Sequence, residues 1–147
     1  MKLAGLLVLC LLLMACSPKP RPIDFGLDQC HFCKMSIVDA RFAAEWVTKK
    51  GRVYKYDAIE CLARQISKAQ QLSSYELVCN YLTPGEWIEV DAATFLISEN
   101  IPSPMGGYLS AFASQSEAES IQDEHGGELY SWHQILEKFG DGNVIVQ

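Results

Sequence analysis

Several common signatures are missing from this sequence of 147 residues. It has no Ser-His-Asp grouping and no glycine-rich phosphate loop, so neither a hydrolase triad nor a nucleotide-binding loop is indicated. Beyond the first fifteen residues, no apolar run is long enough to cross a bilayer. Basic residues are scarce, since 12 Lys and Arg stand against 18 Asp and Glu. This balance argues against nucleic acid as a partner, which would favour a basic face.

The first fifteen residues have the pattern of an export signal. Lys2 is followed by an almost unbroken apolar run up to Ala15, which is too short to span a bilayer as a mature helix. The run ends in LMAC and so resembles a bacterial lipoprotein signal, in which cleavage leaves the cysteine as a lipid-bearing N-terminus. We predict a signal peptide over residues 1–15, lipidation at Cys16 and a protein anchored to a membrane without crossing it. The alternative is an ordinary secretory signal with a coincidental cysteine.

Residues 16–28 are expected to be a tether on the lipid anchor, because Pro18, Pro20 and Pro22 favour extended, unpaired backbone. Residues 29–147 then form one domain. Alternation and turn residues predict two strands joined at Lys49, Lys50 and Gly51, then a helix over 58–70. Further strands are predicted within 75–82, 87–97, 108–113 and 127–131, a loop over 98–107, and helices up to about residues 125 and 139. Capping boxes are predicted at Asp57 with Glu60, Ser114 with Glu117, and Ser131 with Gln134.

A weak internal repeat suggests how these elements are arranged. GRVYKYDAIECL, from Gly51, and GELYSWHQILEK, from Gly127, both pass from a glycine turn through a strand into a helix. Chance or a shared strand-to-helix grammar could also produce so few matches. If the repeat is real, the fold is α+β, with two similar small halves over about 29–75 and 76–147, each strand-turn-strand-helix, packed together.

The stretch CHFCKM, from Cys30 to Met35, concentrates three sulfur side chains in six residues. Lys34 stands where covalent haem attachment would need a histidine. A zinc ribbon would need a second close pair, but Cys61 and Cys79 are 18 positions apart. Neither type of site is therefore indicated.

Two other uses of the cysteines stay open. Cys30 and Cys33 form a C-x-x-C pair that could act in thiol–disulfide exchange, although the strand and helix expected around such a pair do not precede it. Structural disulfides are also compatible with an oxidising compartment. Cys61 and Cys79 could be such a bridge or plain buried apolar residues.

A metal site would also explain Met35. Thiolate and thioether donors together select Cu(I) over zinc, magnesium or calcium. Cys33 and Met35 are two positions apart, so in an extended segment both point to one side and can close on one ion. A further soft ligand is needed, and Met105 is a candidate because it lies in the Pro- and Gly-rich loop SPMGG. A residue at the edge of the core is an equally good interpretation of Met105.

These residues carry a resemblance to a known family. The segments CHFCKMSIVDARFAAEWVTKKGRVYKYDAIECL and IPSPMGGYLSAFASQSEAESIQDEHGGELYSW resemble the NosL family, the copper-binding accessory lipoproteins of nitrous oxide reductase maturation. The resemblance covers about residues 30–132. It implies an extracytoplasmic Cu(I) chaperone without enzymatic activity, anchored by lipid to the cell membrane or outer membrane and facing the periplasm. It further implies apo nitrous oxide reductase and its membrane maturation machinery as partners, and leaves a homodimer open.

The resemblance also implies a ligand set. The family's Cys-x-Met falls on Cys33 and Met35, its Met-Gly loop on Met105 and Gly106, and Cys30 is an additional donor. We expect these sulfurs to hold Cu(I) as releasable cargo, since neutral thioethers are weak donors. The competing function is a membrane-anchored thiol–disulfide oxidoreductase that uses Cys30 and Cys33.

Overall fold

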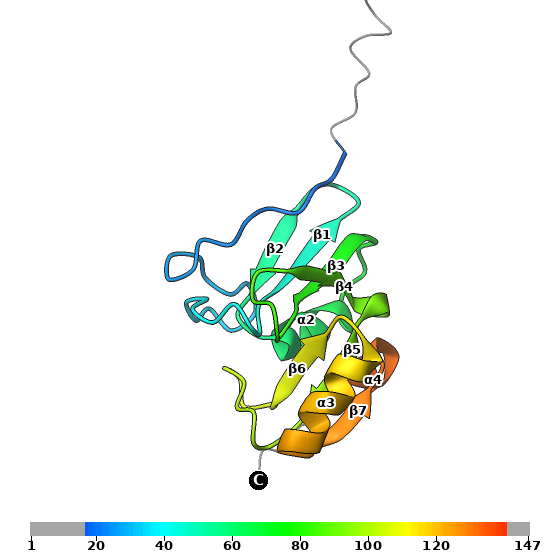
Figure 1. Cartoon of the computed structure of the whole chain (residues 1–147). Helices are drawn as coiled ribbons and strands as arrows, with labels where there is room; N and C mark the ends of the chain where they lie inside the picture. Colours follow the sequence, from blue (N-terminus) through cyan, green and yellow to red (C-terminus); the bar gives the residue numbers. More distant parts are fainter. Residues whose placement is uncertain (1–16, 141–147) are drawn as a thin grey trace, which may run out of the picture.

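Within residues 17–140, two small antiparallel sheets and three helices build the fold, in the α+β class that the sequence predicts (Figure 1). The computed structural model describes residues 17–140. The strands are β1 Ala44–Thr48, β2 Val53–Tyr56, β3 Ser73–Cys79, β4 Trp87–Glu89, β5 Thr94–Ile97, β6 Leu109–Phe112 and β7 Glu128–Tyr130. The helices are α2 Ile59–Ile66, α3 Gln115–His125 and α4 Trp132–Gly140, with a short 3-10 turn, η1, at Val90–Ala92. One sheet has the order β2-β1-β3-β4 and the other β6-β5-β7.

The predicted hairpin at the start of the domain is confirmed. β1 and β2 pair in antiparallel fashion around Lys49, Lys50 and Gly51, and Gly51 has a φ of +78° that glycine adopts without strain. The following helix is shorter than predicted. α2 ends at Ile66, where Ser67 forms the C-cap, and the chain then turns into β3.

Two of the three predicted capping boxes are confirmed in the second half. At α3, Ser114 Oγ accepts from the Glu117 N–H at 3.2 Å, and Glu117 Oε2 accepts from the Ala113 N–H at 3.0 Å. At α4, Gln134 Oε1 accepts from the Ser131 N–H at 2.8 Å. The loop predicted over 98–107 connects β5 to β6. Local capping chemistry therefore sets where both C-terminal helices begin.

The two sheets repeat one topology, but the elements that correspond are not those that the sequence repeat paired. β1, β2, α2 and β3 recur as β5, β6, α3 and β7, because the strand orders β2-β1-β3 and β6-β5-β7 correspond. The passage from β2 into α2 thus matches the passage from β6 into α3, whereas the sequence comparison paired it with β7 and α4. The expected division near residue 75 falls inside β3, and the chain changes sheets at η1.

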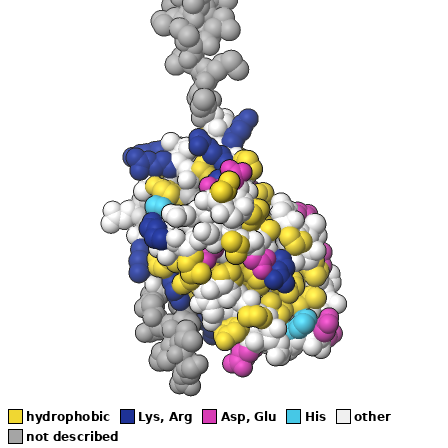
Figure 2. Space-filling view, turned by 90° about the vertical axis from the view of Figure 1, so that its left-hand side faces the viewer, with side chains coloured by type: hydrophobic (Ala, Val, Ile, Leu, Met, Phe, Trp, Pro, Cys, Tyr) yellow, Lys and Arg dark blue, Asp and Glu magenta, His cyan; other side chains and the backbone are white. Residues whose placement is uncertain are grey.

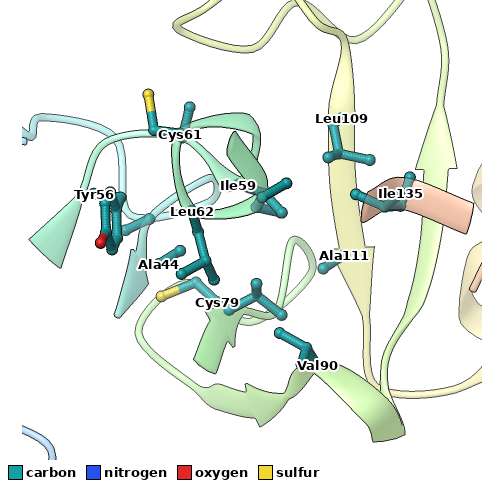
Figure 3. Packing of buried hydrophobic residues seen from close by; sticks show 14 of the residues in the cluster. Ala44, Tyr56, Ile59, Cys61, Leu62, Cys79, Val90, Leu109, Ala111 and Ile135 are labelled. Carbon is teal, nitrogen blue, oxygen red and sulfur yellow. The ribbon is translucent and has the colours of Figure 1, made fainter. Parts of the chain in front are cut away.

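Helix α2 joins the cores of the two halves. It lies between the sheets in Figure 1, and Ile59 and Leu62 on its buried face are completely inaccessible. Figure 3 shows these side chains among residues of β1, β6 and α4, such as Ala44, Leu109 and Ile135. All five belong to one contiguous hydrophobic cluster. The halves therefore fold around a shared core with α2 at its centre.

The described part of the tether is fixed to the first sheet from Arg21 onward. The Arg21 N–H donates to Glu45 Oε1 at 2.9 Å, Lys55 Nζ donates to the Pro22 carbonyl at 2.7 Å, and Ile23 is buried. An extended, unpaired tether up to residue 28 was expected. The apolar side chain of Ile23 favours packing over hydration, which the proline pattern alone does not indicate.

Among residues 17–140, no helix has the length and apolar character needed to span a bilayer. The predicted signal peptide and Cys16 lie outside the described residues.

The buried Glu45 predicts a pH dependence of stability. Burial raises the pKa of this carboxyl group, and its Oε2 has no hydrogen-bond partner. Because the folded-state pKa is raised, the contribution of Glu45 to stability is fully present below its unfolded value of about 4.3 and is lost as pH rises through the folded value. Glu45→Gln removes this loss and keeps an acceptor for the Arg21 N–H.

We therefore expect the free energy of unfolding of Glu45→Gln, relative to the unmodified chain, to increase as pH rises from about 4 toward neutrality. Urea unfolding at several pH values measures this difference. Glu89→Gln, at an exposed position of β4, is the matched control and should follow the unmodified chain. A constant difference between Glu45→Gln and the unmodified chain over this range would contradict the prediction.

Candidate metal centre

The segment CHFCKM folds into a tight knuckle. The Cys30 N–H donates to the Met35 carbonyl at 2.8 Å, and the Lys34 N–H donates to the Cys30 carbonyl at 3.0 Å. Lys34 has a φ of +68°, which reverses the chain, and the bridge between Gln29 and Ser36 closes the loop. The expectation of an extended segment was wrong, because residues 31–33 form a turn. The turn, rather than strand alternation, sets the direction of the Cys33 side chain.

A second segment meets this knuckle where β2 passes into α2. Asp57 follows the last residue of β2, and Cys61 lies in the first turn of α2. The predicted capping box of Asp57 with Glu60 is wrong, because the N-cap residue is Ala58 and no side chain caps the helix. Asp57 and Cys61 are four positions apart, and both face the knuckle.

Three thiols and a carboxylate converge at this point. The ligand atoms of Cys30, Cys33, Asp57 and Cys61 all lie within 4.8 Å of one another. The Cys33 thiol donates to Asp57 Oδ1 at 3.2 Å, and the Cys61 thiol approaches the same oxygen at 3.5 Å. Cys30, Asp57 and Cys61 are buried, whereas Cys33 is partly exposed. We call these four residues the sulfur cluster.

The contacts within the sulfur cluster separate the acidities of its thiols. The hydrogen bond from Cys61 lowers the pKa of Cys30 to about 6, against the opposing effect of burial. Burial raises the pKa of Cys33 to about 11. The pKa of Cys61 is also raised, first by its hydrogen bond to Cys30 and then by burial. Cys30 is therefore the most acidic thiol of the sulfur cluster, and metal binding would require the other two thiols to release their protons.

The chemistry of the sulfur cluster fits a soft cation. Asp57 Oδ2 is buried and has no hydrogen-bond partner. A buried carboxylate oxygen without a partner is costly, and a cation or a rearranged donor would remove that cost. Three thiolates from two separate segments are a donor set for a thiophilic metal. Within the described residues, this is the group of His, Cys, Asp and Glu side chains with metal-binding spacing.

The two predicted methionine ligands lie in segments that border the sulfur cluster. Met35 closes the knuckle and is 50% exposed. Met105 is partly buried and packs on the same core cluster that contains Cys30 and Cys61. The roles of Met35 and Met105 as ligands stay predictions.

The loop that carries Met105 is fixed to the first turn of α2. Ser103 Oγ donates to the buried carboxylate of Glu60 and accepts from the Tyr108 N–H at 2.8 Å. At Gly107 there is no room for a side chain, because a Cβ would lie 2.5 Å from the Glu60 side chain. Glu60 immediately precedes Cys61, so this contact holds the Met105 loop beside the helix turn that carries the cluster.

The remaining candidates lie apart from the cluster. Cys79 is buried in the core, where burial raises its pKa to about 11, and Figure 3 shows its sulfur well away from that of Cys61. No disulfide joins the four described cysteines. The structure therefore favours a buried apolar residue in the core, rather than a disulfide with Cys61, as the role of Cys79. His31 packs against Tyr54, with 4.4 Å between the ring centroids and a tilt of 42° between the rings.

Sequence reasoning did not place Asp57 and Cys61 at the metal site. A signal was present, because YDAIEC puts a carboxylate and a thiol four positions apart at a strand-to-helix passage. The capping-box interpretation of Asp57 and Glu60 obscured it.

Comparisons with known proteins agree with the fold. The NosL family model matches residues 26–139. The crystal structure of the copper chaperone NosL from Shewanella denitrificans superposes with a TM-score of 0.70 at 20% sequence identity, covering 80% of this chain and 95% of that chain. A comparison with curated proteins gives no match.

The sulfur cluster predicts which cysteines contribute to metal binding. Cd²⁺ serves as a probe, because thiolate ligands give it an ultraviolet charge-transfer band. We expect this band to weaken in Cys30→Ala, Cys33→Ala and Cys61→Ala and to stay unchanged in Cys79→Ala, the buried control. Asp57→Asn should keep the band but lower Cd²⁺ affinity by about 10–100-fold, as loss of a supporting carboxylate typically does. An equal response of Cys61→Ala and Cys79→Ala would contradict this assignment.

Proposed function

Because the chain belongs to the NosL family, we propose that it is an extracytoplasmic Cu(I) chaperone that supplies copper for the maturation of nitrous oxide reductase. The observation that carries the proposal is the convergence of Cys30, Cys33 and Cys61 on one point next to Asp57. The fold shared with a protein described as a copper chaperone supports it. Copper is cargo here, and the chain performs no catalysis on it.

The donor set favours Cu(I). Soft thiolate and thioether ligands select Cu(I) over the harder cations. Cys30 offers a thiolate near neutral pH, so binding begins there. Cys33 and Cys61 then release their protons to solvent as they ligate the ion, because metal ligation requires the deprotonated thiol.

The exposure of the ligands suggests a direction for release. Cys61 and Cys30 are buried, Cys33 is partly exposed and Met35 is 50% exposed. An ion that moves from the buried thiols toward Cys33 and Met35 comes within reach of a recipient's own ligands. Met35 and Met105 therefore act as weaker donors at the rim, and transfer proceeds through shared coordination without a covalent step.

The location is part of the proposal. A lipid on Cys16 would anchor the chain to the cell membrane or outer membrane, with the domain facing the periplasm or extracytoplasmic space. The partners would be apo nitrous oxide reductase and the membrane machinery of its maturation.

An anaerobic Cu(I) titration against a competing chelator tests the metal assignment. We expect one tightly bound Cu(I) per chain, and a loss of affinity in Cys33→Ala and Cys61→Ala larger than the roughly 10–100-fold typical of outer-shell changes. Met35→Leu and Met105→Leu should lower affinity less, since thioethers are neutral donors. Cys79→Ala is the matched control and should bind as the unmodified chain does. A stoichiometry near zero for the unmodified chain would remove the proposal.

The competing oxidoreductase function gives a different pattern. A thiol–disulfide exchange assay should then respond to Cys30→Ala and Cys33→Ala but not to Met35→Leu, Met105→Leu or Cys61→Ala. We expect no turnover in this assay, because the C-x-x-C pair lies in a turn and its more acidic thiol is buried. Turnover that survives the loss of Cys61 would support the oxidoreductase.

A further inference from the structure

Basic side chains gather at one end of a protein whose net charge is negative. Lys19 and Arg21 of the tether and Lys49 and Lys50 of the β1–β2 turn line one groove of about 430 Å³, which no acidic residue lines. Arg52 follows the same turn and is exposed. Figure 2 shows Lys and Arg side chains grouped beside the point where the described chain begins. We call Lys19, Arg21, Lys49, Lys50 and Arg52 the basic pole.

No side chain of the basic pole forms an ion pair within the described part of the chain. The ion pairs found there involve Arg41, Lys55, His125 and His133, and none involves a residue of the pole. Glu45 lies beneath the pole but is completely buried, and its Oε1 accepts from the backbone N–H of Arg21. Gathered like charges repel one another, so an external anionic surface would relieve the repulsion.

An exposed apolar side chain adjoins the basic pole. Leu72 is 75% exposed, and its carbonyl accepts from the Lys49 N–H at 2.9 Å. A second groove, of about 270 Å³, is lined by Leu72 together with Lys49 and Lys50. Basic residues around an exposed leucine match the boundary between headgroups and acyl chains, whereas a purely polyanionic partner offers nothing to the leucine.

The tether places this pole close to the expected lipid. Because contacts with Glu45 and Lys55 fix the chain at Arg21 and Pro22, the anchored part begins only five positions after Cys16. Five extended residues span roughly 17 Å. A lipid on Cys16 would therefore hold the basic pole within a short distance of the headgroups.

We propose that the basic pole, with Leu72, is a docking surface for anionic phospholipid headgroups, and that this docking fixes the orientation of the domain on the membrane. β2 runs from the basic turn to Tyr56, so the sulfur cluster after its last residue lies at the far end of the strand. Docking by the pole thus directs the cluster away from the lipid surface and leaves it open to a recipient. The proposal rests on the proposed function only through the lipid anchor.

Amine reactivity on vesicles tests the docking. The full chain is placed on phosphatidylcholine vesicles with or without phosphatidylglycerol and labelled with an acetylating reagent, and each lysine is quantified by mass spectrometry. We expect Lys49 and Lys50 to be protected only on the anionic vesicles and to regain reactivity in high salt. Lys138, on α4 of the second half, is the internal control and should react equally in all samples. Equal reactivity of Lys49 on both vesicle types, or equal protection on both, would overturn the proposal.

Charge reversal sharpens the test. Each basic residue near an anionic membrane surface strengthens the attraction about five-fold, so Lys50→Glu should abolish most of the protection of Lys49. Lys138→Glu, with the same change in net charge, should leave that protection intact. Leu72→Ser should also reduce protection on vesicles. If poly-glutamate in solution protects Lys49 as well as the anionic vesicles do, the surface belongs to an acidic protein and the lipid assignment fails.

A Cu(I) titration of the same samples separates the two proposals. The basic pole is remote from the sulfur cluster, so Lys50→Glu should bind Cu(I) as tightly as the unmodified chain. If the unmodified chain does not bind Cu(I), only the proposed function is contradicted. If its lysines are not protected on anionic vesicles, only the docking is contradicted.

Discussion

Helix α2 begins in the interior of the protein, and most of the other features follow from that. Its first five residues are completely buried between the two sheets. Burying Ile59 and Leu62 contributes roughly 1.5–3 kcal/mol each, and the same turn carries Cys61 and follows Asp57. The position of the ligands is therefore set by the packing that joins the two halves. A metal site at this place costs the protein little additional ordering, since the core already fixes the backbone of the turn.

Three buried carboxyl groups of the described chain each leave one oxygen without a hydrogen-bond partner: Glu45, Asp57 and Glu60. Each such group costs on the order of 1–3 kcal/mol, so their retention needs a reason. Glu45 holds the tether through the Arg21 N–H, and Glu60 holds the Met105 loop through Ser103. The Asp57 side chain accepts hydrogen bonds from thiols alone, those of Cys33 and Cys61. Glu60 thus fixes the loop that borders the site, Glu45 fixes the tether at the other end of the first sheet, and Asp57 supplies a carboxyl group within the site.

The sequence was sufficient to predict most helices and strands, but it did not predict the tertiary contacts between them. Period-2 alternation and turn residues predicted the β1–β2 hairpin, and local capping chemistry predicted the starts of α3 and α4, because those signals act over a few residues. The knuckle at Cys30 was not predictable, since Lys34 adopts a positive φ that lysine rarely takes. The proximity of Cys61 to Cys30 depends on tertiary packing across about thirty residues, and no local pattern encodes it. The C-x-x-C pair could therefore be identified, but not its partners.

The two halves use the equivalent strand-to-helix passage in different ways. The passage from β2 into α2 corresponds to the passage from β6 into α3, so Ala58 and Ser114 are equivalent N-cap residues. In the second half Ser114 and Glu117 cap the helix through their side chains, which typically contributes about 1 kcal/mol.

The first half lacks this cap. Its N-cap is an alanine, and the positions that match Ala113 and Glu117 are Asp57 and Cys61, both turned toward the thiols. The same backbone turn thus serves capping in one half and cation binding in the other. Backbone N–H groups of Cys33 and Asp57 also lower the pKa of the Cys30 thiol, because they stabilise its charged form. The first half therefore lacks the stabilisation of a side-chain cap, and the deep burial of the first five residues of α2 offsets that loss.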